Sequence, residues 1–122
     1  MADKWQAIHN FWNSFNIPAY DENSVPDDAQ MPYITYSAVT SGFEDALVFQ
    51  GNLWYFSTSW QEISNKADEI AQRLMPYVLI PIDKRQYLML VRGQPFAQRM
   101  RDENDRVKRI FLNLMGEYFT KY

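Results

Sequence analysis

The fold is decided by the stretch from Val25 to Met75, which reads VPDDAQMPYITYS over residues 25–37, ALVFQGNLWYFST over 46–58 and SWQEISNKADEIAQRL over 59–74. The first segment passes from an acidic, proline-containing loop into aromatic and β-branched residues, which predict a strand over residues 33–39. The second segment predicts strands over 43–49 and 53–58. A hairpin at residues 50–52 would join them, because Gly51 and Asn52 tolerate positive φ.

The third segment predicts a helix that packs on the strands. Ser59 and Glu62 stand at the spacing of a capping box, in which two side chains satisfy free amides of the first turn. The apolar residues that follow share one helical face: Ile63, Ala67, Ile70, Ala71 and Leu74. Pro76 ends this helix.

The rest of the chain supplies one more helix and two more strands. Aromatic and apolar residues at spacings of three and four predict an amphipathic helix over residues 3–15, followed by an exposed loop over 19–30. Residues 87–92 predict a strand and residues 93–106 a long charged loop. Residues 107–119 fit either a helix or a strand. Ile110, Leu112 and Leu114 alternate with Arg109, Phe111 and Asn113, and Gly116 disfavours a helix, so we expect a strand.

These elements predict one domain over residues 1–122 of the α+β class. Its two layers would follow the order α-β-β-β-α-β-β, with a mostly antiparallel sheet covered by helices. A length of 122 residues suits a single core. The chain has no cysteine, which excludes disulfides and thiolate chemistry. It also lacks a signal peptide or a membrane-spanning apolar run, so we expect a soluble protein made in the cytosol.

Charge is divided unevenly along the chain. Residues 1–65 hold one basic residue, Lys4, and eight acidic ones, whereas residues 66–122 hold eleven basic and seven acidic ones. Chance clustering would give a solvated surface, but this polarity also suits head-to-tail contact between copies or contact with a charged partner. On the second interpretation an acidic surface at Asp21, Glu22, Asp27, Asp28, Glu44 and Asp45 meets a basic surface at Lys84, Arg85, Arg92, Arg99 and Arg101.

The sequence offers little for catalysis or cofactor binding. His9 is the only histidine, and no carboxylate stands at helical spacing to orient it. Asp102, Glu103 and Asp105 lack the glycine and distant glutamate of a calcium loop, and neighbouring arginines are expected to pair with them. The four glycines are isolated, so no phosphate-cradling loop is expected. We therefore predict a protein that is not an enzyme and needs no metal or cofactor.

Together these elements resemble the small neck and tail-completion proteins of long-tailed bacteriophages and related prophages, particularly the tail-terminator type. The resemblance covers nearly the whole chain. It rests on the aromatic N-terminal helix, the stretch MPYITY at residues 31–36 after an acidic loop, the hairpin leading into the Ser-capped helix, and two late strands separated by a charged loop.

The resemblance implies a structural virion protein without catalytic residues, assembled in the host cytoplasm. It would form a ring, commonly of six copies, on the end of the tail tube. There it would stop tube growth and join the tail to the head through tail-tube and neck proteins, while genome DNA only passes through the lumen and no membrane is involved. A head-completion or minor capsid protein is an alternative, and so is a monomeric adaptor or ligand-binding module.

Overall fold

The computed structural model describes residues 4–39 and 46–120. The elements follow one another as α1 (Lys4–Trp12), β1 (Ala19–Asp21), β2 (Tyr33–Val39), β3 (Ala46–Phe56), α2 (Gln61–Arg73), β4 (Val78–Pro81), β5 (Gln86–Met100) and β6 (Val107–Thr120).

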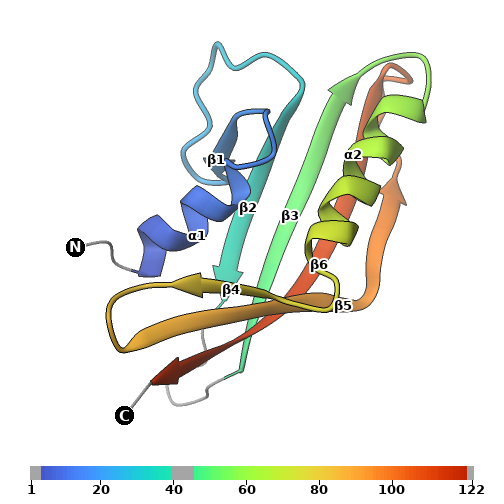
Figure 1. Cartoon of the computed structure of the whole chain (residues 1–122). Coiled ribbons are helices and arrows are strands. Elements are labelled where there is room, and N and C mark those ends of the chain that lie inside the picture. The colour runs from blue at the N-terminus through green and yellow to red at the C-terminus, as the bar shows by residue number, and fades with distance from the viewer. Residues whose placement is uncertain (1–3, 40–45, 121–122) are drawn as a thin grey trace.

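The strands form one six-stranded sheet in the order β1-β2-β3-β6-β5-β4 (Figure 1). β1 pairs with β2 in parallel, and the other neighbouring strands are antiparallel. The predicted two-layer α+β class is wrong: the chain is mostly sheet, with 46% strand and 20% helix, and the sheet is curled and mixed. The predicted element order omits the short strand β4, and the loop expected over residues 19–30 begins with β1. Strands of three and four residues are too short to show a period in the sequence.

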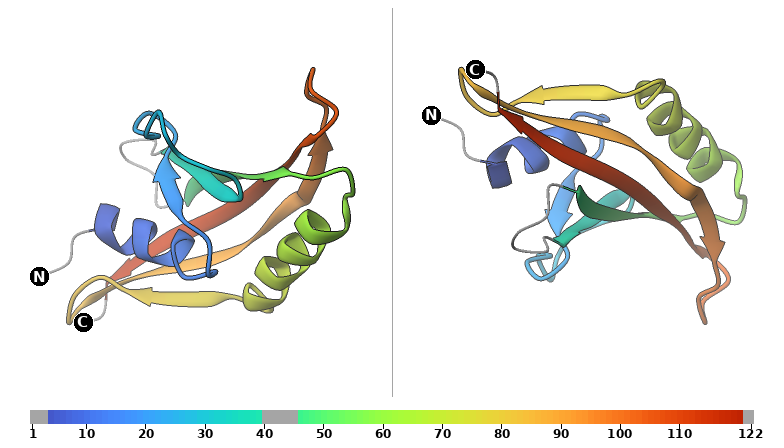
Figure 2. Two further views of the ribbon diagram at one scale, coloured as in Figure 1. Left: turned by 90° about the horizontal axis from the view of Figure 1, so that it is seen from above. Right: turned by 90° about the horizontal axis from the view of Figure 1, so that it is seen from below.

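Both helices pack against the same face of the sheet, which we call the inner face. Every second residue of the central strands is buried there, as Phe49 and Leu53 are on β3 and Ile110, Leu112 and Leu114 are on β6. The sheet curls so strongly that α1 contacts both β1 and β4, the two edge strands. Figure 2 shows α1 held between these edges. The buried side chains of helices and strands join in one hydrophobic cluster.

The expected hairpin at residues 50–52 is wrong, because β3 runs straight through it. Gly51 pairs with Tyr36 on one side and Leu112 on the other. A Cβ at this position would lie 2.7 Å from the indole ring of Trp12. The glycine therefore provides room for Trp12 of α1 to lie on the sheet, and not the positive φ of a turn.

The side of α2 that packs on the sheet was predicted correctly, but the capping arrangement at its N-terminus was not. Ile63, Ala67 and Ile70 are buried, as the apolar spacing indicates. The residue before the helix is Trp60, which makes no side-chain cap, and Ser59 Oγ instead accepts the amide of Gln61 at 3.0 Å. The capping box between Ser59 and Glu62 is therefore not the observed arrangement.

The last two strands are longer than expected. The strand predicted over residues 107–119 is confirmed as β6. The loop predicted over 93–106 is mostly wrong, because β5 continues to Met100. Arg92 pairs with Leu114 and Ala97 with Leu112, so β5 carries extra residues in between and forms a bulge. Pro95 lies within this bulge, where a residue without an N–H is tolerated. A proline inside a segment normally indicates a loop, so the sequence does not reveal that the strand continues here.

Candidate functional site

Four of the six acidic residues of the predicted interface lie at the end of β1 and in the loop that follows it. Asp21 ends β1, and Glu22, Asp27 and Asp28 follow it in the exposed loop before β2. A hydrogen bond of 3.1 Å from the Ala29 amide to the Pro26 carbonyl closes a turn over residues 26–29. This acidic turn places Asp27 and Asp28 at its two central positions, where side chains project from the chain. Glu44 and Asp45 lie outside the described residues.

The basic residues of the predicted interface are spread along β5 and the turn before it. Lys84 and Arg85 occupy the turn between β4 and β5, whereas Arg99 and Arg101 stand at the far end of β5. A strand rises by about 3.3 Å per residue, so these two ends are tens of ångströms apart along the chain. Arg92 lies between them, beside the bulge.

The charges near the end of β5 are largely engaged within the molecule. The guanidinium of Arg99 lies 4.8 Å from the centre of the Trp60 ring, and its Nη2 is 3.5 Å from Ser64 Oγ. The ammonium of the buried Lys108 is 5.5 Å from the same ring and donates to the Asp105 carbonyl. These cation–π contacts fix Trp60 just before α2.

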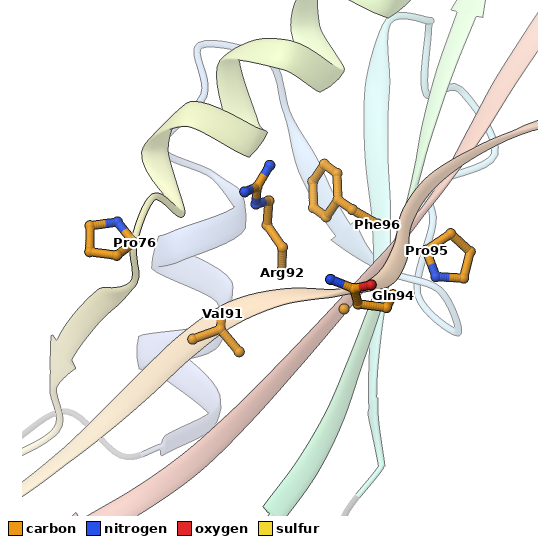
Figure 3. Close-up of a pocket in the computed structure, with 7 residues that line it drawn as sticks. Pro76, Val91, Arg92, Gln94, Pro95 and Phe96 are labelled. Atoms are coloured by element: carbon orange, nitrogen blue, oxygen red, sulfur yellow. The ribbon is translucent and has the colours of Figure 1, made fainter.

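Arg92 instead lines a pocket at the bulge, which we call the bulge pocket. Its volume is about 360 Å³, and its walls are Pro76, Val91, Arg92, Gly93, Gln94, Pro95 and Phe96. Figure 3 shows the Arg92 side chain rising from β5 toward the C-terminal end of α2, with Phe96 pointing the same way and Pro76 across the opening. The Nη2 group of Arg92 donates to Met75 Sδ, a weak acceptor.

Gly93, which lines this pocket, packs closely against Asn113 of β6. A Cβ on Gly93 would lie 2.5 Å from Asn113 Nδ2 and 2.8 Å from the Asn113 carbonyl oxygen, so this backbone touches β6 directly.

Within residues 4–39 and 46–120 the one ion pair is Lys66–Glu69, at 3.0 Å. The guanidinium of Arg92 thus has no carboxylate partner in the described part of the chain, and the bulge pocket can accept an anion.

The other residues considered for chemistry have structural contacts. His9 Nδ1 is 2.8 Å from the hydroxyl of Tyr36, whose pKa is raised by burial and by the nearby charge of Asp21. The expected pairing of Asp102, Glu103 and Asp105 with arginines is wrong for the described residues, and Asp102 Oδ1 accepts the Asn104 amide at 3.2 Å. No group of three or more metal-ligating side chains occurs in the described ranges.

Sequence reasoning missed the outer face of the sheet, the side turned away from the helices. Among its large apolar side chains, Phe56, Leu79 and Met115 are 56%, 50% and 47% exposed. Met89, Val91 and Met115 line a shallow hollow of about 150 Å³ with Gly116 and Glu117. The sequence carries a signal for this face, because residues 87–91 of β5 are aromatic or apolar at every position, and on β6 Phe111 and Met115 alternate with Ile110, Leu112 and Leu114.

One half of the outer face is ordered by an aromatic row. Tyr20 contacts Tyr33 with ring centres 5.8 Å apart, and Tyr33 lies 6.4 Å from Trp54. Trp54 Nε1 donates to Thr35 Oγ1 at 2.9 Å, and the guanidinium of Arg109 lies 5.1 Å from the Trp54 ring. In the half formed by β4, β5 and β6, the described residues place one stacked aromatic pair, Tyr87 and Phe119 with ring centres 5.3 Å apart, beside the half-exposed Leu79 and Met115.

The described residues include no helix that is long and apolar enough to cross a membrane. The sequence matches no family model, and no curated protein is similar enough to it to be called a relative.

Proposed function

We propose that this chain is a structural assembly protein of a long-tailed bacteriophage or prophage, a tail terminator that forms a ring at the end of the tail tube and joins it to the head. The observation that carries the proposal is the uncovered outer face, with Leu79 and Met115 half exposed on neighbouring parts of one sheet. Contiguous apolar surface on a small protein is typical of a contact site for another protein.

The arrangement of charge adds support for contact between identical copies. The loop between β1 and β2, which holds the acidic turn, and the bulge of β5, which lines the pocket, lie in different parts of the molecule (Figure 1), so a contact between them joins unlike surfaces. Contacts of this type, repeated with a constant rotation, form a ring when the rotation per subunit closes and an open filament when it does not. In the proposed assembly the tail-tube and neck proteins bind the two ends of the ring, and genome DNA passes through its lumen.

Electron microscopy of the purified protein, alone and mixed with purified tail tubes, tests the proposal. We expect rings, and tubes that carry one ring at the end that would join the head. A protein that binds capsids but not tubes would be a head-completion protein instead. A protein that stays monomeric at high concentration and leaves tubes bare would contradict the assembly function.

A variant on the outer face provides a sharper test. Met115→Glu places a charge in the hollow beside Glu117 without changing the inner face. We expect it to fold as the parent does and to lose binding to copies or tubes, whereas Asp68→Asn on the exposed side of α2 should retain both. Equal assembly of the two variants would remove the outer face from the proposal.

A further inference from the structure

We infer that the bulge pocket is the acceptor for the acidic turn of a second copy of this chain, with the guanidinium of Arg92 binding the carboxylate of Asp27 or Asp28. The inference rests on the proposed function, because it names the contact that joins neighbouring subunits. It predicts a heterologous contact in which each copy offers its turn to one neighbour and its pocket to the other.

The pocket has the chemistry of a carboxylate receptor. A guanidinium offers several N–H donors in a fixed plane, which suits the two oxygens of a carboxylate. One of these donors of Arg92 forms a hydrogen bond to the weak acceptor Met75 Sδ. Gln94 adds an amide to the lining, and Pro76, Pro95 and Phe96 add apolar groups beside it. Arg92 itself is exposed, so a carboxylate of another molecule can reach it.

The turn has the shape and charge of a matching ligand. The hydrogen bond from the Ala29 amide to the Pro26 carbonyl holds residues 26–29 in a tight turn, with Asp27 and Asp28 at its two central positions. Both side chains are exposed, and neither has an ion pair within the described residues. Asp21, in contrast, already accepts the amide of Asn23 at 2.9 Å, so its carboxylate stabilises the start of the loop.

The turn and pocket of a single copy do not meet. Figure 1 shows the loop between β1 and β2 at one end of the sheet and the bulge of β5 below the C-terminal end of α2. The charge complementarity is therefore between molecules. Arg99 is a weaker candidate for this contact, because Trp60 and Ser64 already hold it.

A charge exchange between two variants tests the contact. Arg92→Glu repels the turn of a neighbour, and the double variant Asp27→Lys/Asp28→Lys repels the pocket. We expect each preparation alone to associate at least about tenfold more weakly than the wild type. When the two are mixed, every contact between unlike copies joins opposite charges, so association should return and should alternate the two variants in even-numbered rings.

Native mass spectrometry counts the copies and their composition, and sedimentation velocity measures the affinity. Arg101→Glu is the matched control, because it reverses a charge that is also exposed, just beyond the end of β5. It should associate as the wild type does. Circular dichroism of each variant checks the fold, and Arg92→Gln, which cannot repel the turn, should show a smaller loss and a weaker dependence on salt.

The outcomes separate this inference from the proposed function. Wild-type rings together with unchanged association of Arg92→Glu, or a mixture that does not recover, would overturn the turn-to-pocket contact and leave the assembly function in place. A wild type that forms no ring and caps no tube would overturn both. Recovery in the mixture, with loss in each variant alone, supports the contact.

Discussion

The two faces of the sheet are built from the same strands but differ in what covers them. On β6, Leu114 is fully buried under the helices, while its neighbour Met115 points to the other side and is 47% exposed. On β3, Leu53 is fully buried and Phe56 is 56% exposed. Alternation places successive side chains on opposite faces, so hydrophobicity alone does not distinguish a core position from an exposed one.

This difference separates stability from assembly. The inner face buries its apolar groups within one chain and therefore supplies folding free energy. The outer face leaves groups such as Phe56, Leu79 and Met115 about half exposed, so these groups contribute less to folding of the monomer. In the proposed assembly they lose water only when another molecule binds.

The largest effect is expected from truncating the inner face. Leu114→Ala should reduce the free energy of unfolding by about 2–5 kcal/mol, because it leaves a cavity in a buried site. Met115→Ala, one residue away on the outer face, should change it by no more than about 0.5 kcal/mol. Urea unfolding of both variants measures the contrast, and equal losses would mean that the outer face is also packed within the monomer.

Overpacking the inner face should have the next largest effect. Gly51→Ala adds a methyl group that would lie 2.7, 2.9 and 3.2 Å from three atoms of the Trp12 ring, so the loss should be about 1–3 kcal/mol. Combining it with Trp12→Leu should give less than the sum of the two losses, because the clash is then relieved. Additive losses would indicate that Trp12 does not rest on Gly51.

A smaller effect is expected from the ordered half of the outer face. Trp54→Phe removes the donor to Thr35 Oγ1 while keeping an aromatic ring, and Thr35 is buried. The loss should be about 1 kcal/mol, as for one hydrogen bond with its acceptor left in place. Thr35→Val with Trp54→Phe should recover part of it in the same urea measurement. A change as large as that of Leu114→Ala would place Trp54 in the core.

The sequence predicts many of the buried positions on the inner face, but it does not predict the edge strands of the sheet or the bulge pocket. The spacing of Ile63, Ala67 and Ile70 and the alternation around Ile110 identify the buried sides of α2 and β6 correctly. Gly51 was misread because a glycine that makes room for Trp12 has the same sequence signal as one that turns the chain. Pro95 likewise indicates a loop although it sits in a bulge of β5.

The sequence identifies the charged residues of the proposed contact but does not show how they are arranged. The sequence places Arg92 among other cations, but only the register of β5 and β6 shows that it lines a pocket while Arg99 stacks on Trp60. Such contacts join residues distant along the chain, so no local pattern reports them. The acidic turn is local, and its residues Asp27 and Asp28 were predicted as exposed, as the structure confirms.

The smallest predicted effect is a decrease in the free energy of unfolding at high pH, which arises on the inner face and is absent near neutral pH. Burial raises the pKa of Tyr55 and Tyr118 above the ordinary value of 10.0, and the charges of Glu62 and Glu69 raise that of Tyr55 further. Between the unfolded and folded pKa values the unfolded chain binds fewer protons, so the free energy of unfolding falls as pH rises. The contribution of these two tyrosines is fully present below the unfolded pKa of 10.0 and is lost as pH rises through their folded pKa values. Urea unfolding across this range measures the slope, and Tyr55→Phe, which keeps the ring on the inner face, should make it shallower. The same slope in parent and variant would mean that the Tyr55 hydroxyl is solvated like one on the outer face.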